Sequence, residues 1–451
     1  MKKKLFSCLA AILLLFTIFS LPAGAATYTI DFELNCSSVE LVNLDTNTIV
    51  YSKNADEKRY PASLTKIMVY IIVIENVSDP DGTTTTVSKE AIEELQGTGG
   101  SSSGLKAGDK LTITQLLNCL MVPSGNDAAI VLSDFLCDGS TSAFVEKMNQ
   151  KAQELGCKNT HFTNVHGLHD ENHYTTAHDM AVITEYAMNT PNFMEISDQT
   201  RYTYSPLDGP EKGTERMVTT SNRLIDPNLD PQYYYSYARG IKTGFTDEAG
   251  YCIVSNAVNP NTGYSYLCVA MGAPSVDKNG NKVEKHGECI DSKNLYEWAF
   301  DSLRIQKIAA KEDAVTEIPL KYAWNKDKLL LTPEDDCSTI LPEDISASSV
   351  LATPNIPESV EAPVKKGQVI GTVTFSYAGQ DLLTTNLVAA ESVERSELLK
   401  SAATIKDVVT SGWFLAIAAV VIVLVAAYLI LALIYNRKKK KLRTVKKYKD
   451  L

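Results

Sequence analysis

The segment Pro61-Ala62-Ser63-Leu64-Thr65-Lys66-Ile67-Met68 and the apolar run after it predict a helix over Ala62–Ile74, with Pro61 at its start. Proline suits the first position of a helix, because its missing N–H would have no partner there. Ser63 and Lys66 are three residues apart and so share one helical face. A serine hydroxyl needs a base within hydrogen-bond reach to act as a nucleophile, and a lysine can serve when its pKa is lowered.

Two further polar motifs follow in order, Ser124-Gly125-Asn126 and Lys242-Thr243-Gly244. The first follows an apolar helical segment and Pro123, which predicts a tight turn at a helix end. The second reads as an edge strand in which Gly244 lets a substrate backbone approach closely. Each motif alone has an ordinary structural interpretation, and Ser-x-x-Lys occurs roughly twice by chance in a chain of this length. The ordered set predicts a serine acyl-transfer site.

The two ends of the chain predict export and a membrane anchor. Residues 1–25 combine three early lysines, an apolar run and Ala23-Gly24-Ala25, the pattern of a signal peptide. Residues 412–435 carry no charge and are long enough to cross a bilayer. The basic tail 436–451 then predicts a cytoplasmic C-terminus and an extracytoplasmic catalytic region.

The charge distribution agrees with this orientation. The chain carries a net charge of −11, and residues 26–435 carry −22, because the tail contributes +8 and the first lysines +3. An acidic exterior argues against a nucleic-acid partner. The basic tail fits contact with anionic lipid headgroups.

The exported part suggests two domains. Residues 26–305 mix helical and strand patterns and predict an α/β (α+β) domain, a sheet covered by helices. Helices are expected over 111–121 and 143–155, and strands over 253–257 and 264–271. Residues 306–395 predict a small β-rich domain, and 396–411 a linker of helical composition. The eight cysteines after Cys8 show no paired spacing and read as small buried hydrophobes.

The motifs resemble those of the serine D-alanyl-D-alanine carboxypeptidases, the low-molecular-weight penicillin-binding proteins of serine peptidase family S11. The similarity extends over the segments 61–68, 116–128, 164–179 and 240–252, and over 362–367 and 388–391 in the later module. It implies the serine DD-peptidase/β-lactamase-like fold, a peptidoglycan stem peptide as substrate, β-lactams as inhibitors and no cofactor.

The resemblance also implies catalytic roles. Ser63 would attack the carbonyl between the last two D-alanines, Lys66 would take its proton, and Ser124 would relay a proton to the departing D-alanine. Five further residues would bind the substrate: Asn126, Lys242, Thr243, Gly244 and Phe245. Asn126 would contact the substrate amide, and Lys242 would supply positive charge.

The remaining residues of this set lie on the predicted edge strand. Thr243 would contact the terminal carboxylate, and Gly244 would leave room for the substrate. The N–H groups of Ser63 and Phe245 would form the oxyanion hole.

Two departures from the family pattern stand out. Relatives often carry an arginine before a Glu-Ser-Lys stretch that helps to anchor the substrate carboxylate, whereas Gly287-Glu288-Cys289 has none, which leaves Lys285 or His286 as substitutes. A charge-free span also replaces the amphipathic anchoring helix of many relatives.

Several alternatives remain open. Five histidines between His161 and His178 could suggest a metal site, but Gly167 and Asn172 favour a loop, so no metal is expected. His166 and His173 are expected to shape that loop, and a role in the site is open for both. Thr176 and Asp179 are expected to cap a helix over Met180–Met188. Other functions are a DD-endopeptidase, a tethered class A β-lactamase and a non-catalytic penicillin-binding wall scaffold.

Overall fold

A computed structural model describes residues 28–277 and 279–448, so the predicted signal peptide lies outside the described residues. The chain divides into two compact units. The first contains the described residues through Ile308 together with 337–351 and 374–384. The second contains 309–336, 352–373 and the chain from Thr385 onward.

A five-stranded antiparallel sheet forms the centre of the first unit. Its order is β2 (Thr48–Lys53), β1 (Ser38–Asn43), β9 (Ser265–Ala273), β8 (Gly250–Val258) and β7 (Ala238–Thr246). The predicted strands therefore exist with slightly wider bounds. β7, which carries the Lys-Thr-Gly motif, is an edge strand as predicted.

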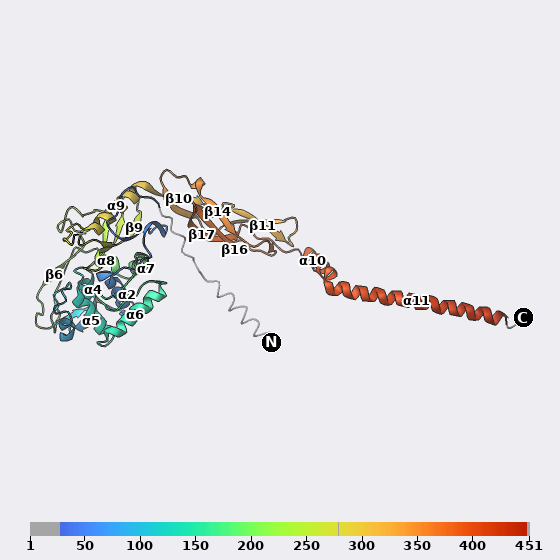
Figure 1. Cartoon of the computed structure of the whole chain (residues 1–451), viewed down its shortest axis with the longest axis horizontal. Helices are drawn as coiled ribbons and strands as arrows, with labels where there is room; N and C mark the ends of the chain where they lie inside the picture. Colours follow the sequence, from blue (N-terminus) through green and yellow to red (C-terminus); the bar gives the residue numbers. More distant parts are fainter. Residues whose placement is uncertain (1–27, 278, 449–451) are drawn as a thin grey trace. The chain divides into compact units, whose positions relative to one another are not determined.

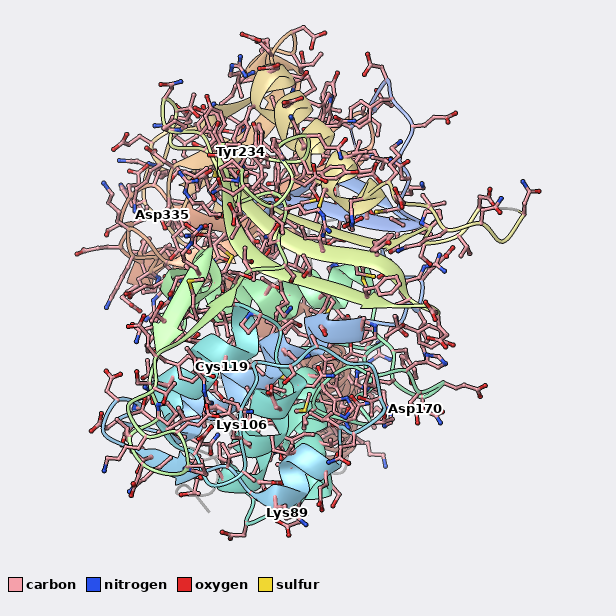
Figure 2. All side chains as sticks on the ribbon, turned by 90° about the vertical axis from the view of Figure 1, so that its left-hand side faces the viewer. Lys89, Lys106, Cys119, Asp170, Tyr234 and Asp335 are labelled. Atoms are coloured by element: carbon pink, nitrogen blue, oxygen red, sulfur yellow. The ribbon has the colours of Figure 1, made fainter. Side chains whose placement is uncertain are left out.

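Both faces of this sheet are buried, because its strands are apolar on both sides. Along β9, Leu267, Val269 and Met271 pack into one core, whereas Tyr266, Cys268 and Ala270 pack into the other. Side chains in a strand alternate between faces, so a continuous apolar run supplies two cores. Figures 1 and 2 show α9 (Gly287–Ser302) on one side of the sheet and most other helices on the opposite side.

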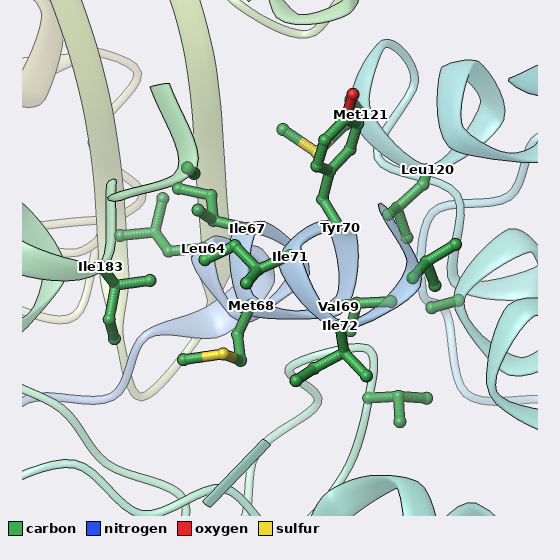
Figure 3. Close-up of a cluster of buried hydrophobic side chains, with 14 of the residues drawn as sticks. Leu64, Ile67, Met68, Val69, Tyr70, Ile71, Ile72, Leu120, Met121 and Ile183 are labelled. Carbon is green, nitrogen blue, oxygen red and sulfur yellow. The ribbon is translucent and has the colours of Figure 1, made fainter. Parts of the chain in front are cut away.

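The helices on that opposite side surround α2 (Lys66–Asn76). They are α4 (Ile113–Met121), α5 (Asn126–Leu136), α6 (Thr141–Glu154), α7 (Ala177–Met188) and α8 (Phe193–Ser197). Every residue of α2 from Lys66 to Val73 is buried, and its side chains leave the helix in all directions (Figure 3). A helix that is apolar all round belongs in a core.

Four predicted helix starts need adjustment, and the helix predicted over 143–155 is α6, which begins at Thr141 after its cap Ser140. Ala62–Thr65 forms a 3-10 turn, η1, so the α-helix begins only at Lys66. α4 begins at Ile113 because the Thr112 side chain and Gln115 form a capping box. Thr176 caps α7 as predicted, but the helix begins at Ala177 and the Asp179 carboxylate instead accepts hydrogen bonds from Asn159 and Thr160.

Smaller elements complete the first part of the chain. They are two antiparallel two-stranded sheets, β3 (Thr84–Thr86) with β4 (Lys110–Thr112) and β5 (Arg201–Tyr204) with β6 (Arg216–Thr219), and the short helix α3 (Lys89–Glu93). The seven cysteines from Cys36 to Cys289 are free thiols, and six of them are buried, as expected for small hydrophobes.

The later region is rich in strands, as predicted. β10 (Leu303–Ala309) pairs with β13 (Cys337–Pro342). A six-stranded sheet has the order β14 (Leu351–Asn355), β16 (Val369–Tyr377), β17 (Gln380–Ala389), β12 (Lys328–Pro333), β11 (Thr316–Lys321) and β15 (Val360–Glu361).

Two helices follow the strands, α10 (Glu397–Thr410) and α11 (Gly412–Tyr448). The segment Gly412–Lys438 is long and apolar enough to cross a membrane. The predicted span therefore falls on a continuous helix.

Candidate active site

Ser63 and Lys66 lie next to each other at the junction of η1 and α2. The Nζ atom of Lys66 is 3.0 Å from the Ser63 Oγ, 2.6 Å from the Asn126 Oδ1 and 2.8 Å from the backbone oxygen of His166. A neutral amine has two N–H donors and one lone pair. If its donors bind the two carbonyl oxygens, its lone pair is left for the Ser63 hydroxyl.

The surroundings of Lys66 favour this neutral form. Its side chain is completely buried, and burial together with the nearby charge of Lys242 holds the pKa of Lys66 well below its usual value. Asp127 acts in the opposite direction but does not outweigh the loss of hydration. A lysine with a lowered pKa can accept a proton near neutral pH.

Lys242 is the second buried lysine of the site. It lies on β7, is 2% exposed, and its Nζ donates a hydrogen bond to the backbone oxygen of Thr243 at 2.8 Å. Burial lowers the pKa of Lys242 to about 7. A large fraction of Lys242 is therefore still charged at neutral pH.

The Ser-Gly-Asn motif forms the predicted turn, between α4 and α5. Ser124 has a positive φ of 64°, and Asn126 is the first residue of α5. The Ser124 Oγ is buried and is the one hydroxyl of the three motifs without a hydrogen-bond partner within the described residues. Because an unpaired buried hydroxyl is costly, this group is available to a ligand.

The Gly/Ser-rich loop over Gly97–Gly104, before this turn in the chain, supports the site. Its sequence pattern does not indicate this role. Ser101 accepts a hydrogen bond from Asn126 N through its backbone oxygen, and its hydroxyl donates to the Ser124 backbone oxygen. Gly100 is also part of this arrangement, since a Cβ at that position would lie 2.2 Å from the Asn126 Nδ2. The loop thus fixes the backbone of the Ser124–Asn126 turn by hydrogen bonds.

Asp127 anchors the same loop to the start of α5. Its buried carboxylate accepts hydrogen bonds from the Ser102 hydroxyl, from both the N–H and the hydroxyl of Ser103, and from the N–H of Leu105. The only available signal in the sequence was an acidic residue directly after the Ser-Gly-Asn motif.

β7 lies directly against the nucleophile. A Cβ on Gly244 would be 2.9 Å from the Pro61 backbone oxygen and 3.2 Å from the Ser63 N. The Thr243 hydroxyl is 2.5 Å from the Ser221 hydroxyl. The Phe245 ring is 47% exposed and stacks on Tyr251 at 4.8 Å. Sequence reasoning missed Ser221, which lies outside all three motifs.

The loop His161–Tyr174 also reaches the site. The His166 backbone oxygen contacts Lys66, and a Cβ on Gly167 would lie 1.9 Å from the Ala62 backbone oxygen. His173 holds this loop to η1 through its Nε2, which is 2.8 Å from the Thr65 Oγ1. His166 and His173 therefore shape the loop as predicted, and His166 contributes its main chain to the site.

Neither proposed substitute for the missing arginine is free of other contacts. The Lys285 Nζ is 3.2 Å from the Asn35 Oδ1, and the His286 Nδ1 is 2.8 Å from the Glu288 Oε1. Within residues 28–277 and 279–448, no group of three or more histidine, cysteine or acidic side chains is arranged to hold a metal ion.

A half-buried serine beside a fully buried lysine, a second buried lysine and a free edge strand define the class of serine acyl-transfer enzymes. A family model for D-alanyl-D-alanine carboxypeptidase matches residues 25–275, and one for the penicillin-binding protein 5 C-terminal domain matches residues 304–395. The chain belongs to the serine D-alanyl-D-alanine carboxypeptidase family of penicillin-binding proteins.

Relatives and solved structures agree with this assignment. The chain is 28% identical to D-alanyl-D-alanine carboxypeptidase DacF of Bacillus subtilis over 402 residues, covering 88% of this chain and 96% of DacF. It is 28% identical to DacA of Escherichia coli strain K12, covering 85% and 89% of the two chains.

Penicillin-binding protein 5 from Haemophilus influenzae superimposes with a TM-score of 0.65 at 26% identity, over 82% of this chain and all of that one. The Streptomyces K15 DD-transpeptidase superimposes with a TM-score of 0.53 at 29% identity, over 60% of this chain and all of that one.

Proposed function

We propose that this protein removes the terminal D-alanine from peptidoglycan stem pentapeptides through an acyl-enzyme on Ser63. The observation that carries the proposal is the contact between the buried Lys66 Nζ and the Ser63 Oγ, in surroundings that lower the lysine pKa. Family membership supports the substrate class.

Acylation would start with proton transfer from Ser63 to Lys66 as the serine oxygen bonds to the carbonyl carbon between the two D-alanines. The N–H groups of Ser63 and Phe245 would stabilise the oxyanion, each donor contributing a few kcal/mol to lowering the barrier. Asn126 would hold the substrate amide beside them, and Gly244 leaves space for the substrate backbone.

The C–N bond would then break, and the departing amine would need a proton. The unpaired Ser124 hydroxyl supports the role of a relay that passes the proton from Lys66 to this amine. Thr243 would bind the terminal carboxylate, and the charge of Lys242 would favour it electrostatically. The arginine that relatives often carry before the Glu-Ser-Lys stretch is missing here. The substrate carboxylate would therefore bind to the Ser221–Thr243 hydroxyl pair.

In the second half of the reaction, Lys66 would accept a proton from the attacking water. It would return the proton to the Ser63 oxygen as the ester C–O bond breaks. A β-lactam would acylate Ser63 by the same route. Because it would remain on Ser63 as a stable ester, we expect β-lactams to inhibit the protein.

The test uses the full-length protein in detergent. It should release free D-alanine from diacetyl-Lys-D-Ala-D-Ala, and mass spectrometry after penicillin treatment should find the adduct on the Ser63 peptide. Ser63→Ala should abolish both. A modification on Ser124, or D-alanine release by the Ser63 variant, would reject the assignment.

We further propose that α11 anchors the protein as a single-pass segment, with the catalytic region outside the cell and the basic tail in the cytoplasm. The apolar helix Gly412–Lys438 and the basic residues after it support this arrangement.

A further inference from the structure

A cavity of about 700 Å³ lies beside the candidate catalytic residues without being lined by them. Its walls include the segments 58–60 and 247–250. Tyr60 is three residues before Ser63, and Asp247 is two residues after Phe245. At most about 3.8 Å separates successive Cα atoms, so the Cα atoms of Tyr60 and Asp247 are within about 11 Å of those of Ser63 and Phe245. We name this space the flanking cavity.

The flanking cavity carries charges of both signs. Lys58 and Arg59 line it together with the carboxylates of Glu171, Asp247 and Glu248. Cavities of this volume are typical of small-ligand sites. A ligand that matches these walls would itself carry both a positive and a negative group.

The charges of the cavity are only weakly satisfied by one another. Within the described part of the chain, no ion pair joins Lys58 to a carboxylate or joins Glu171 or Asp247 to a basic side chain. Lys58 instead lies 3.8 Å from the Tyr174 ring centre, and Glu248 is 3.9 Å from the Nδ1 of His169. These groups therefore have bonding capacity left for a ligand.

Arg59 gives an independent indication. Its Nε is buried and has no hydrogen-bond partner among the described residues, while its terminal nitrogen pairs with Glu57 at 2.5 Å. A buried N–H without a partner is costly, and a bound anionic group is one way to satisfy it.

The direction of the substrate follows from the proposed roles on β7. The terminal carboxylate lies at Thr243 and the scissile carbonyl at Phe245, so the substrate runs antiparallel to β7. Its third residue from the C-terminus is then expected at the end of the strand, beside Asp247 and Glu248. A long side chain on that residue would reach the flanking cavity.

We propose that the flanking cavity binds the zwitterionic end of the side chain on the substrate's third residue from the C-terminus. That end carries an ammonium and a carboxylate on one carbon. Glu248 and Asp247 receive the ammonium, and Lys58 and Arg59 receive the carboxylate. The proposal rests on the proposed carboxypeptidase function and adds a basis for choosing among stem peptides.

Three peptides of the form X-D-Ala-D-Ala test it with the full-length protein in detergent. X is diacetyl-Lys, which is neutral, or Nα-acetyl-Lys, which has an ammonium, or Nα-acetyl-diaminopimelate, which has the zwitterion. The kcat/KM should be at least about tenfold higher for the zwitterionic peptide than for the neutral one, the scale of one charge-assisted hydrogen bond.

Two variants separate the two charges. Glu248→Gln should reduce the preference for both charged peptides over the neutral one, whereas Lys58→Met should reduce only the preference for the zwitterion over the ammonium peptide. Glu146→Gln and Lys147→Met, at exposed positions on α6, are the matched controls and should keep the wild-type ratios.

The outcomes separate this proposal from the proposed function. D-alanine release from all three peptides with equal kcat/KM would overturn the role of the cavity alone. The cavity would also lose this role if the control variants changed the ratios as much as the cavity variants do. Release from none of the peptides would overturn the carboxypeptidase function and this inference with it.

Discussion

The Nζ atom of Lys66 lies 3.0 Å from the Oγ of Ser63 and is fully enclosed by protein. The enclosure matters as much as the distance. An exposed lysine would remain protonated and could not accept a proton, whereas burial beside Lys242 lowers the pKa of Lys66. Acylation should therefore depend on this contact and on the elements that maintain it.

Lys66→Arg is expected to fold but not to acylate. The guanidinium preserves a positive charge and cannot give up its proton near neutral pH, so Ser63 loses its base. Labelling by fluorescent penicillin on a gel measures acylation, and thermal unfolding checks the fold. The exposed Lys147→Arg change is the control, and labelling of Lys66→Arg at the wild-type rate would disprove the role of Lys66.

Lys242 should impose an alkaline limit on acylation. The rate should rise with pH as Lys66 becomes neutral and fall again through about pH 7, where Lys242 loses its proton. Lys242→Arg should remove the alkaline limb because its charge persists. Lys242→Ala should slow acylation by at least ~10²-fold, the scale of losing one preorganised electrostatic contact. A profile identical in all three proteins would contradict this role.

Gly167→Ala should damage the site beyond its effect on backbone conformation. Gly167 and Gly156 both have φ of +84°, but an added Cβ meets the Ala62 oxygen at 1.9 Å in the first case and no atom within 4 Å in the second. Both changes should lower the melting temperature through the same backbone strain. Only Gly167→Ala should slow acylation, on the order of 10²-fold, by displacing Ser63. Equal acylation rates in the two variants would refute this account.

His178 should make stability depend on pH. Its Nδ1 is 3.0 Å from the buried carboxylate of Glu40, and this hydrogen bond raises the pKa of His178 from 6.5 to about 9 in the folded protein. Since the folded value is above the unfolded one, the stabilisation is complete below about pH 6.5 and is lost as pH rises through about 9.

The melting temperatures of wild type and His178→Gln should therefore differ most at low pH and converge as pH rises. His161→Gln, at an exposed position, provides the comparison. A constant difference in melting temperature across this pH range would show that the contact between His178 and Glu40 is not the source of the stabilisation.

The proposed orientation predicts the pattern of proteolysis. Protease added to intact cells should leave the tail after Asn436 undigested, while residues 26–410 should become digestible once the wall is removed. Antibodies against the two regions can follow each fragment. Digestion of the tail in intact cells would reverse the orientation and exclude an extracellular substrate.

Most of the fold could be predicted from local patterns. The apolar runs of α2 and β9 identify buried elements, and the charge-free span before a basic tail identifies a membrane helix. Both patterns are readable because apolar side chains have a lower free energy away from water, whatever the rest of the chain does. The second and third motifs were placed correctly on a turn and an edge strand, whereas the first spans the 3-10 turn η1 and the first residue of α2.

Element boundaries were less predictable. The capping of α4 by Thr112 and Gln115 and the 3-10 turn before Lys66 depend on individual hydrogen bonds, which composition does not determine.

The sequence by itself determined which residue types are available for acyl transfer and in what order they occur. The tertiary structure decided which of them meet. Ser221 joins Thr243, the Ser101–Leu105 loop holds Asn126 through Asp127, and Gly167 packs behind Ser63. These contacts join residues far apart in the chain, and burial by the whole fold sets the protonation of Lys66. A local pattern contains no information about either.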